Sequence, residues 1–135
     1  IDEVIQTLLV PTYVTITVQP NLPSINGNAW RFKQVFQNLI QNAIKYGNPE
    51  KGSIQVGYTD HDDHYQFFVK DNGIGIKSDY YDKIFKVFTK LESTGSSSGI
   101  GLSIVKKIIT YYKGTIWVDS QEGVGTTFYF TLLKN

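Results

Sequence analysis

A run of alternating side chains that ends in an acid followed by glycines places the strongest constraint on this sequence. Tyr65, Phe67 and Val69 occupy every second position and predict one apolar face of a β-strand over 65–70. The same alternation places Asp71 on that face, where a carboxylate without a hydrogen-bond donor is costly to bury. Since the local sequence offers no evident donor, a bound ligand is a candidate for that role.

The residues after this acid are rich in glycine. Gly73 and Gly75 lie in the stretch 71–76, DNGIGI, and remove two side chains, which permits unusual backbone angles and lets a flat group approach the main chain. An acceptor beside bare backbone suits an amino-substituted aromatic ring such as adenine. Asp-Asn-Gly is also a common turn, so this loop alone does not separate a nucleotide site from a plain turn.

Length and composition predict one folded domain over residues 1–135. Hydrophobic residues make up 41% of the chain, and the net charge of +1 gives no electrostatic argument for binding nucleic acid or a membrane. The absence of cysteine excludes disulfides and thiolate metal sites. No apolar run approaches the roughly 20 residues of a membrane span, and no signal peptide opens the chain. We therefore expect a soluble domain, or a soluble piece of a larger protein.

Hydrophobic periodicity predicts an α/β domain with five strands and two long helices. The helices are expected over 29–46 and 99–112, and the strands over 13–18, 53–58, 65–70, 115–119 and 126–132. A short helical pattern over 1–10 ends at Pro11. The serine- and glycine-rich end of the segment 77–98 predicts a mobile connection.

The helix expected over 29–46 has two faces. Its core stripe consists of Phe32, Val35, Phe36, Leu39 and Ala43, and its polar stripe of Arg31, Gln34, Asn38, Asn42 and Lys45. Asn38 and Asn42 lie four residues apart, hence on one helix face. These amides could form an ordinary solvated surface. Alternatively, an Asn carbonyl could bind Mg²⁺, which keeps waters and phosphate oxygens as its other ligands, with Lys45 facing the phosphate charge.

Two further glycine pairs are ambiguous on their own. The pair at 99 and 101 opens the second long helix, where exposed backbone N–H groups favour an anion. This is a weak pattern, and it is not a dinucleotide fingerprint because no strand precedes it. The stretch 123–126, GVGT, is compatible with nothing more than a hairpin turn.

The order of these motifs resembles that of the catalytic, ATP-binding domain of sensor histidine kinases, in the GHKL superfamily with gyrase B subunits, chaperones and mismatch-repair proteins. The stretch 34–46 is similar to the family's N box, 71–76 to its G1 box and 84–88 to its F box. The stretches 98–106 and 123–128 are similar to its G2 and G3 boxes. Five motifs in the family's order span nearly the whole chain, so the resemblance is specific.

This resemblance implies a Bergerat fold: a two-layer α+β sandwich with a mixed, mostly antiparallel sheet, helices on one face and ATP held beneath a flexible lid. It implies that Asp71 accepts a hydrogen bond from the adenine amino group, that Gly75 lies beside the ring and that Thr126 supports the water network there. Asn42 would bind Mg²⁺ with help from Asn38, and both would serve catalysis together with Lys45. The other nucleotide-contacting positions it implies are Tyr46, Gly73, Ile76, Lys90, Gly99, Ile100, Gly101 and Leu102.

One position favours a kinase over an ATPase. In the ATP-hydrolysing members of the superfamily, a Glu stands four residues before the Mg²⁺-binding Asn and acts as general base. Here that position is Asn38, and an amide has no useful basicity. We therefore expect slow ATP hydrolysis, with Mg·ATP binding retained for transfer to a protein acceptor. Lys86 and Lys90 are the cations available in the lid, and which of them reaches phosphate stays open.

The phosphoacceptor expected of this family is a histidine in an upstream dimeric helical hairpin, and residues 1–10 would be the stub leading from it. His61 and His64, the only histidines, fall in a predicted turn over 60–64, which favours a solvated turn over a phosphoacceptor or a metal site. The resemblance thus implies a cytoplasmic, monomeric domain that binds nucleotide without autophosphorylation. Its partners would be the hairpin of a homodimeric parent and a response-regulator receiver domain. A regulatory nucleotide-binding module and an anti-sigma-factor-type serine kinase are the alternatives.

Overall fold

The computed structural model describes residues 12–23, 29–48, 50–75 and 100–134. Within these ranges the elements, in chain order, are β1 (Val14–Val18), α2 (Ala29–Lys45), β2 (Gly52–Asp60), β3 (His64–Asp71), α3 (Ile100–Tyr111), β4 (Ile116–Gln121) and β5 (Gly125–Leu133). Each strand and long helix expected from periodicity is present, with ends shifted by no more than two residues. The helical pattern over 1–10 and the segment 77–98 lie outside the described residues.

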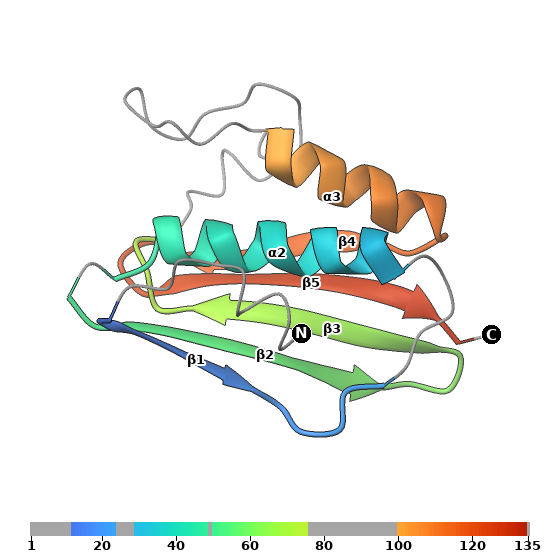
Figure 1. Ribbon diagram of the computed structural model, residues 1–135, viewed down its shortest axis with the longest axis horizontal. Coiled ribbons are helices and arrows are strands. Elements are labelled where there is room, and N and C mark those ends of the chain that lie inside the picture. The colour runs from blue at the N-terminus through green and yellow to red at the C-terminus, as the bar shows by residue number, and fades with distance from the viewer. Residues whose placement is uncertain (1–11, 24–28, 49, 76–99, 135) are drawn as a thin grey trace.

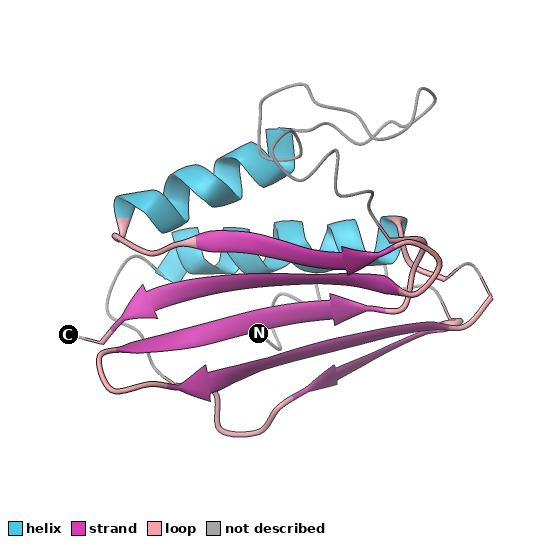
Figure 2. Cartoon of the chain, turned by 180° about the vertical axis from the view of Figure 1, so that it is seen from behind, coloured by secondary structure: helices cyan, strands magenta, loops and turns pink. Residues whose placement is uncertain are grey.

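The five strands form one sheet in the order β1-β2-β3-β5-β4. β1 pairs with β2 in parallel, and the other three pairings are antiparallel. Figures 1 and 2, which view the molecule from opposite sides, place both helices on the same side of this sheet. The expected two-layer architecture with a mixed, mostly antiparallel sheet is therefore confirmed.

The core lies between the helices and the inner face of the sheet. Phe67 of β3 and Phe130 of β5 stack with ring centroids 5.2 Å apart, and the ring of Phe36 from α2 meets both edge-on. Burial alternates along β3 and β5 as a strand with one apolar face requires. The predicted core stripe of α2 is buried or packs against the core, and it is joined by Ile40, which the stripe had not included.

The hairpin between β2 and β3 is closed by the turn expected over 60–64, where the His61 N–H donates to the His64 carbonyl oxygen at 3.0 Å. Register along this pair sets Ile54 opposite Asp71, so the acid stands at the far end of β3 from the histidines. Neither described helix has the length and apolar character needed to cross a bilayer.

Candidate functional site

Asp71 ends β3 on the inner face of the sheet, where only 5% of its surface is exposed. Its Oδ1 accepts two backbone hydrogen bonds, from the Gly73 N–H at 2.8 Å and the Thr126 N–H at 3.2 Å. The expectation that the local sequence offers this acid no donor is therefore wrong, because Gly73 is two residues away. The donors escaped sequence reasoning because one is a backbone group two residues away and the other arrives from β5.

The second oxygen of this carboxylate is the one open to a ligand. Among the described residues both hydrogen bonds end on Oδ1, so Oδ2 has no partner there. In the described part of the chain, His61 Nε2 is the one side-chain polar atom that is both fully buried and without a hydrogen-bond partner. Since Oδ2 of Asp71 also has no partner, it is not fully buried and keeps some access to its surroundings. One carboxylate oxygen is therefore held by the main chain, and the other is left without a hydrogen bond from the described residues.

Burial raises the pKa of Asp71 to about 6, although the hydrogen bonds from Gly73 and Thr126 act in the opposite direction. The carboxyl is therefore ionised near neutral pH, and the ionised form is the one that accepts a hydrogen bond from an amino group. A carboxyl group with a shifted pKa at the end of a sheet strand is a typical feature of a functional site.

This pKa predicts a pH-dependent stability. The folded state binds the Asp71 proton more tightly than the unfolded chain, whose pKa is near 3.8, so stability from this residue is greatest below about pH 4 and is lost as pH rises through about 6. Over that range, wild-type stability relative to Asp71→Asn should fall by about 2–3 kcal/mol. Urea unfolding of both proteins at acidic and neutral pH measures this difference, and a constant difference would show that burial does not perturb Asp71.

The loop after Asp71 is held between α2 and the β4–β5 hairpin. On one side the Ile74 N–H donates to the carbonyl oxygen of Tyr46, the residue after α2, at 3.1 Å. On the other side the Gly123 N–H donates to the Ile74 carbonyl oxygen at 2.8 Å. The end of β3, the end of α2 and the turn of the hairpin therefore meet at one place.

The two glycines of this loop serve its packing against the protein. A Cβ at Gly73 would lie 2.0 Å from the Tyr46 carbonyl oxygen, and one at Gly75 would lie 2.3 Å from the Gln121 carbonyl oxygen. Gly75 also has φ +78°, a conformation that favours glycine. The chain's own backbone occupies the space that those Cβ atoms would take, so packing alone accounts for both glycines. The expected approach of a ligand ring to this main chain stays a prediction.

Asn72 is a structural residue of this loop that sequence reasoning did not single out. Its Nδ2 donates to the Lys51 carbonyl oxygen at 2.9 Å, and its Oδ1 accepts from the Ser53 N–H at 2.9 Å. The side chain thus ties the loop to the beginning of β2. A polar residue capable of both donating and accepting, directly after the acid, was the available signal.

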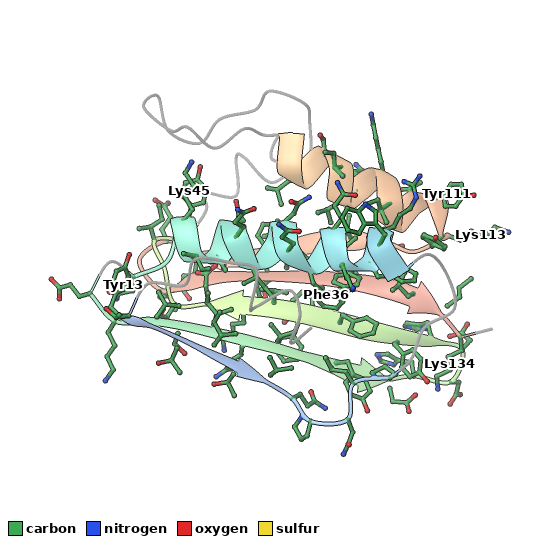
Figure 3. The ribbon with its side chains drawn as sticks, in the orientation of Figure 1. Tyr13, Phe36, Lys45, Tyr111, Lys113 and Lys134 are labelled. Atoms are coloured by element: carbon green, nitrogen blue, oxygen red, sulfur yellow. The ribbon has the colours of Figure 1, made fainter. Side chains whose placement is uncertain are left out.

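The predicted polar stripe of α2 ends close to the Asp71 loop. Asn38 and Asn42 are half-buried and lie on one helix face. Lys45, in the last turn, is exposed, and its Nζ lies 5.9 Å from the ring centroid of Tyr46. Figure 3 shows Lys45 extending from the C-terminal end of α2 away from the sheet. Through the Tyr46 carbonyl, the structure brings this end of α2 to the Asp71 loop.

Thr126 begins the buried part of β5. Its hydroxyl lies 2.8 Å from the Ser120 hydroxyl, which donates to the Gly125 carbonyl oxygen at 3.0 Å. Because Ser120 uses its one proton for Gly125, the Thr126 hydroxyl donates to Ser120 and keeps its lone pairs as acceptors. Thr126 thus supports Asp71 through its N–H bond, and the expected role of its hydroxyl beside the adenine stays a prediction.

Several predicted positions are not placed with the site. The structure does not describe Ile76, Lys90, Gly99 or the F-box-like stretch 84–88, which includes Lys86. Ile100 and Gly101 begin α3, of which only the backbone is described at these two positions, and the side chain of Leu102 is buried in the core. Their contact with nucleotide stays a prediction.

The two histidines lie away from this place, at the start of β3. Their rings stack with centroids 4.5 Å apart, and His64 Nδ1 lies 2.6 Å from Asp63 Oδ1, a contact that lowers the pKa of that exposed acid. Within the described ranges, no group of three or more histidine, cysteine or acidic residues could hold a metal ion. The expected solvated turn fits Asp62 and Asp63, which are exposed, but not His61, whose Nε2 is buried without a partner.

Comparison with known proteins assigns the class. Residues 27–135 match the family model described as "Histidine kinase-, DNA gyrase B-, and HSP90-like ATPase". The chain belongs to this family, and the recognition of its ordered motifs is confirmed. Family membership implies an ATP-binding domain of the kind used for phosphotransfer in two-component signalling.

Within that class the relatives include a phytochrome and a histidine kinase. The chain is 44% identical over 123 residues to cyanobacterial phytochrome A of Nostoc sp., covering 90% of this chain and 16% of that protein. It is 37% identical over 120 residues to the methanogenesis regulatory histidine kinase FilI of Methanothrix harundinacea, covering 88% of this chain and 14% of that protein. The chain thus spans about a sixth of the length of these relatives.

Solved structures agree with this placement. The catalytic domain of histidine kinase ThkA superposes with a TM-score of 0.77 at 30% identity, covering 90% of this chain and 80% of that one. The mycobacterial sensor histidine kinase MprB gives a TM-score of 0.77 at 26% identity, covering 89% of this chain and 82% of that one. The protein is a histidine-kinase-type catalytic domain.

Proposed function

We propose that this domain binds Mg·ATP and, in its parent protein, donates the γ-phosphoryl group to a histidine of a separate helical hairpin. The observation that carries the proposal is the buried Asp71 carboxylate, held by Gly73 and Thr126 through one oxygen while the other is open to a donor. The adenine amino group is the donor that this acceptor suits.

The other half of the nucleotide would lie along the C-terminal end of α2. The Asn42 amide oxygen would be one ligand of Mg²⁺, whose remaining ligands would be phosphate oxygens and waters, and Asn38 would assist from the preceding turn. Lys45 and Tyr46 would contact phosphate or nucleotide. When bound, Mg²⁺ neutralises phosphate charge. A site with one amide ligand and no carboxylate cluster in the described residues fits a metal that arrives with ATP.

The start of α3 would supply backbone donors to the phosphates. Gly99 and Gly101 would allow the chain to present N–H groups at a helix N-terminus, beside Ile100 and Leu102. A cation from the lid, Lys86 or Lys90, would complete the charge neutralisation.

The amide of Asn38 allows a test of whether the domain acts as a kinase rather than as an ATPase. Asn38→Glu introduces a base one helical turn before Asn42 and should raise the rate of ATP hydrolysis at least about 10-fold, since a positioned general base contributes about 10²–10⁴-fold. Asn38→Gln, which has the same side-chain shape without basicity, is the matched control. Steady-state phosphate release measures both, and equal rates would indicate that position 38 does not face the attacking water.

Transfer itself is tested by adding the parent protein's phosphoacceptor hairpin in trans with ATP labelled in the γ-phosphate. We expect an acid-labile, base-stable phosphohistidine on the hairpin, and no label when the domain carries Asn42→Ala. An acid-stable label on a serine of a partner would favour the anti-sigma-factor-type kinase. Nucleotide binding without any label on the hairpin would favour the regulatory module and contradict the transfer proposed here.

A further inference from the structure

A cavity of about 410 Å³ opens between α2 and α3, well away from the Asp71 loop. Its lining residues are Arg31, Gln34, Ile104, Lys107, Ile108 and Tyr111, which we call the α2–α3 groove. Arg31 precedes Tyr46 by 15 residues, a span of roughly 20 Å along a helix. The groove therefore lies at the opposite end of α2 from the proposed nucleotide site.

The groove combines an apolar floor with cationic and polar edges. Ile104, which is partly buried, and Ile108, which is buried, lie one turn apart on α3 and form the aliphatic floor. Arg31 of α2 and Lys107 of α3 supply fixed positive charge from the two sides, and neither forms an ion pair with another described residue. A ligand that matches this lining has an apolar body flanked by carboxylates.

Charge is distributed unevenly over the molecule. The chain has 13 basic and 12 acidic residues, yet α2 and α3 contain no Asp or Glu. Their charged residues are all basic: Arg31, Lys33, Lys45, Lys106 and Lys107. A nearly neutral domain thus presents a helical layer with one sign of charge, which attracts acidic partners and raises their association rate.

One exposed aromatic residue lines the groove, and a second precedes a lining residue by one helical turn. Trp30 and Tyr111 are each 76% exposed, and Trp30 lies one turn before the lining residue Gln34. The ring of Tyr111 meets Tyr112 edge-on with ring centroids 5.1 Å apart, and Tyr112 packs against Phe32 at 4.8 Å, so a partly buried contact supports this edge. Figure 3 shows Tyr111 and Lys113 together at the same end of the helical layer. Trp, Tyr and Arg are the residue types that dominate binding energy at protein interfaces.

We propose that the α2–α3 groove binds an acidic segment of another protein, which inserts an apolar side chain over Ile104 and Ile108 and places carboxylates against Arg31 and Lys107. A protein segment fits better than the other anionic macromolecules. A nucleic-acid backbone would leave the isoleucine floor without an apolar partner, and a flat bilayer surface would not fill a concave cavity. This inference goes beyond the proposed nucleotide chemistry and does not depend on it.

Selection of short random peptides displayed on phage, against the whole chain saturated with a non-hydrolysable ATP analogue and Mg²⁺, tests the proposal. We expect the selected peptides to carry Asp and Glu around a Leu, Ile or aromatic residue. In fluorescence polarisation, their affinity should fall about 10-fold or more on Arg31→Glu and on Lys107→Glu. Lys70→Glu, the same change at an exposed position on β3, should leave it unaltered.

Three results would overturn the proposal. The first is a selection that yields no acidic consensus, and the second is a set of peptides that bind the charge-reversed variants as well as the wild type. The third is binding of phosphatidylserine vesicles that is abolished by Arg31→Glu and Lys107→Glu and is not reduced by the peptides. Calorimetry with ATP separates this test from the nucleotide site, because Arg31→Glu should leave ATP affinity unchanged. Circular dichroism confirms that each variant is folded.

Discussion

Asp71→Asn should weaken ATP binding about 100-fold or more while the domain stays folded. The Gly73 and Thr126 N–H groups both need an acceptor, so the amide oxygen of the new Asn should take the place of Oδ1. The amide nitrogen then takes the place of Oδ2 and directs its own hydrogens at the adenine amino group. An acceptor is thus replaced by a donor, and a charge-assisted bond by an unsatisfied contact, which together cost about 3 kcal/mol or more.

Calorimetry with a non-hydrolysable ATP analogue measures this loss, and thermal unfolding verifies the fold. Asp62→Asn is the matched control, because it removes the same charge from an exposed acid in the turn before β3 and should bind as the wild type does. Unchanged affinity in Asp71→Asn would remove this residue from the nucleotide site. Loss of binding together with unfolding would instead assign Asp71 a structural role.

Gly75→Ala should destabilise the domain more than Gly123→Ala by at least about 2 kcal/mol. Both glycines have φ +78°, so both substitutions carry the same left-handed strain of about 1–2 kcal/mol. Only at Gly75 does the new Cβ meet backbone, 2.3 Å from the Gln121 carbonyl oxygen, whereas Gly123 has no atom within 4 Å of its Cβ position. The difference in stability between the two variants therefore measures the effect of the close contact between the loop and the β4–β5 hairpin, apart from the backbone strain.

Urea unfolding of the two variants gives the comparison directly. Gly75→Ala should also weaken ATP binding, since the loop that carries Asp71 must shift to relieve the contact, whereas Gly123→Ala should retain wild-type affinity. Equal losses of stability in the two variants would show that the loop is not tightly held between α2 and the hairpin.

Much of the fold could be predicted because its signals are local. Strict alternation along β3 placed Asp71 on the inner face, and the helical stripe of α2 placed Leu39 in the core; both are confirmed. The turn over 60–64 follows from polar residues between two alternating runs. The family's motif order then indicated the class.

Apart from the Gly73 N–H bond to Asp71, the interactions that could not be predicted join residues far apart in the chain. Nothing local to Asp71 shows that Thr126, 55 residues away, would supply an N–H. Likewise, a sequence shows that Gly73 and Gly75 lack side chains without showing whether ligand or backbone occupies the space. The α2–α3 groove depends on two helices that only the folded structure brings together. Long-range pairing, rather than residue type, carries this information.

The comparison of ATP with inosine triphosphate tests the central claim most directly, because the two nucleotides differ where Asp71 would bind. Inosine replaces the amino group of adenine with a carbonyl oxygen, which would face the Asp71 carboxylate. By calorimetry with Mg²⁺ and the wild-type domain, inosine triphosphate should bind about 10- to 100-fold more weakly than ATP, since an unpaired buried polar group costs about 1–3 kcal/mol. Equal affinity for the two nucleotides would contradict the assignment of Asp71 as the adenine acceptor.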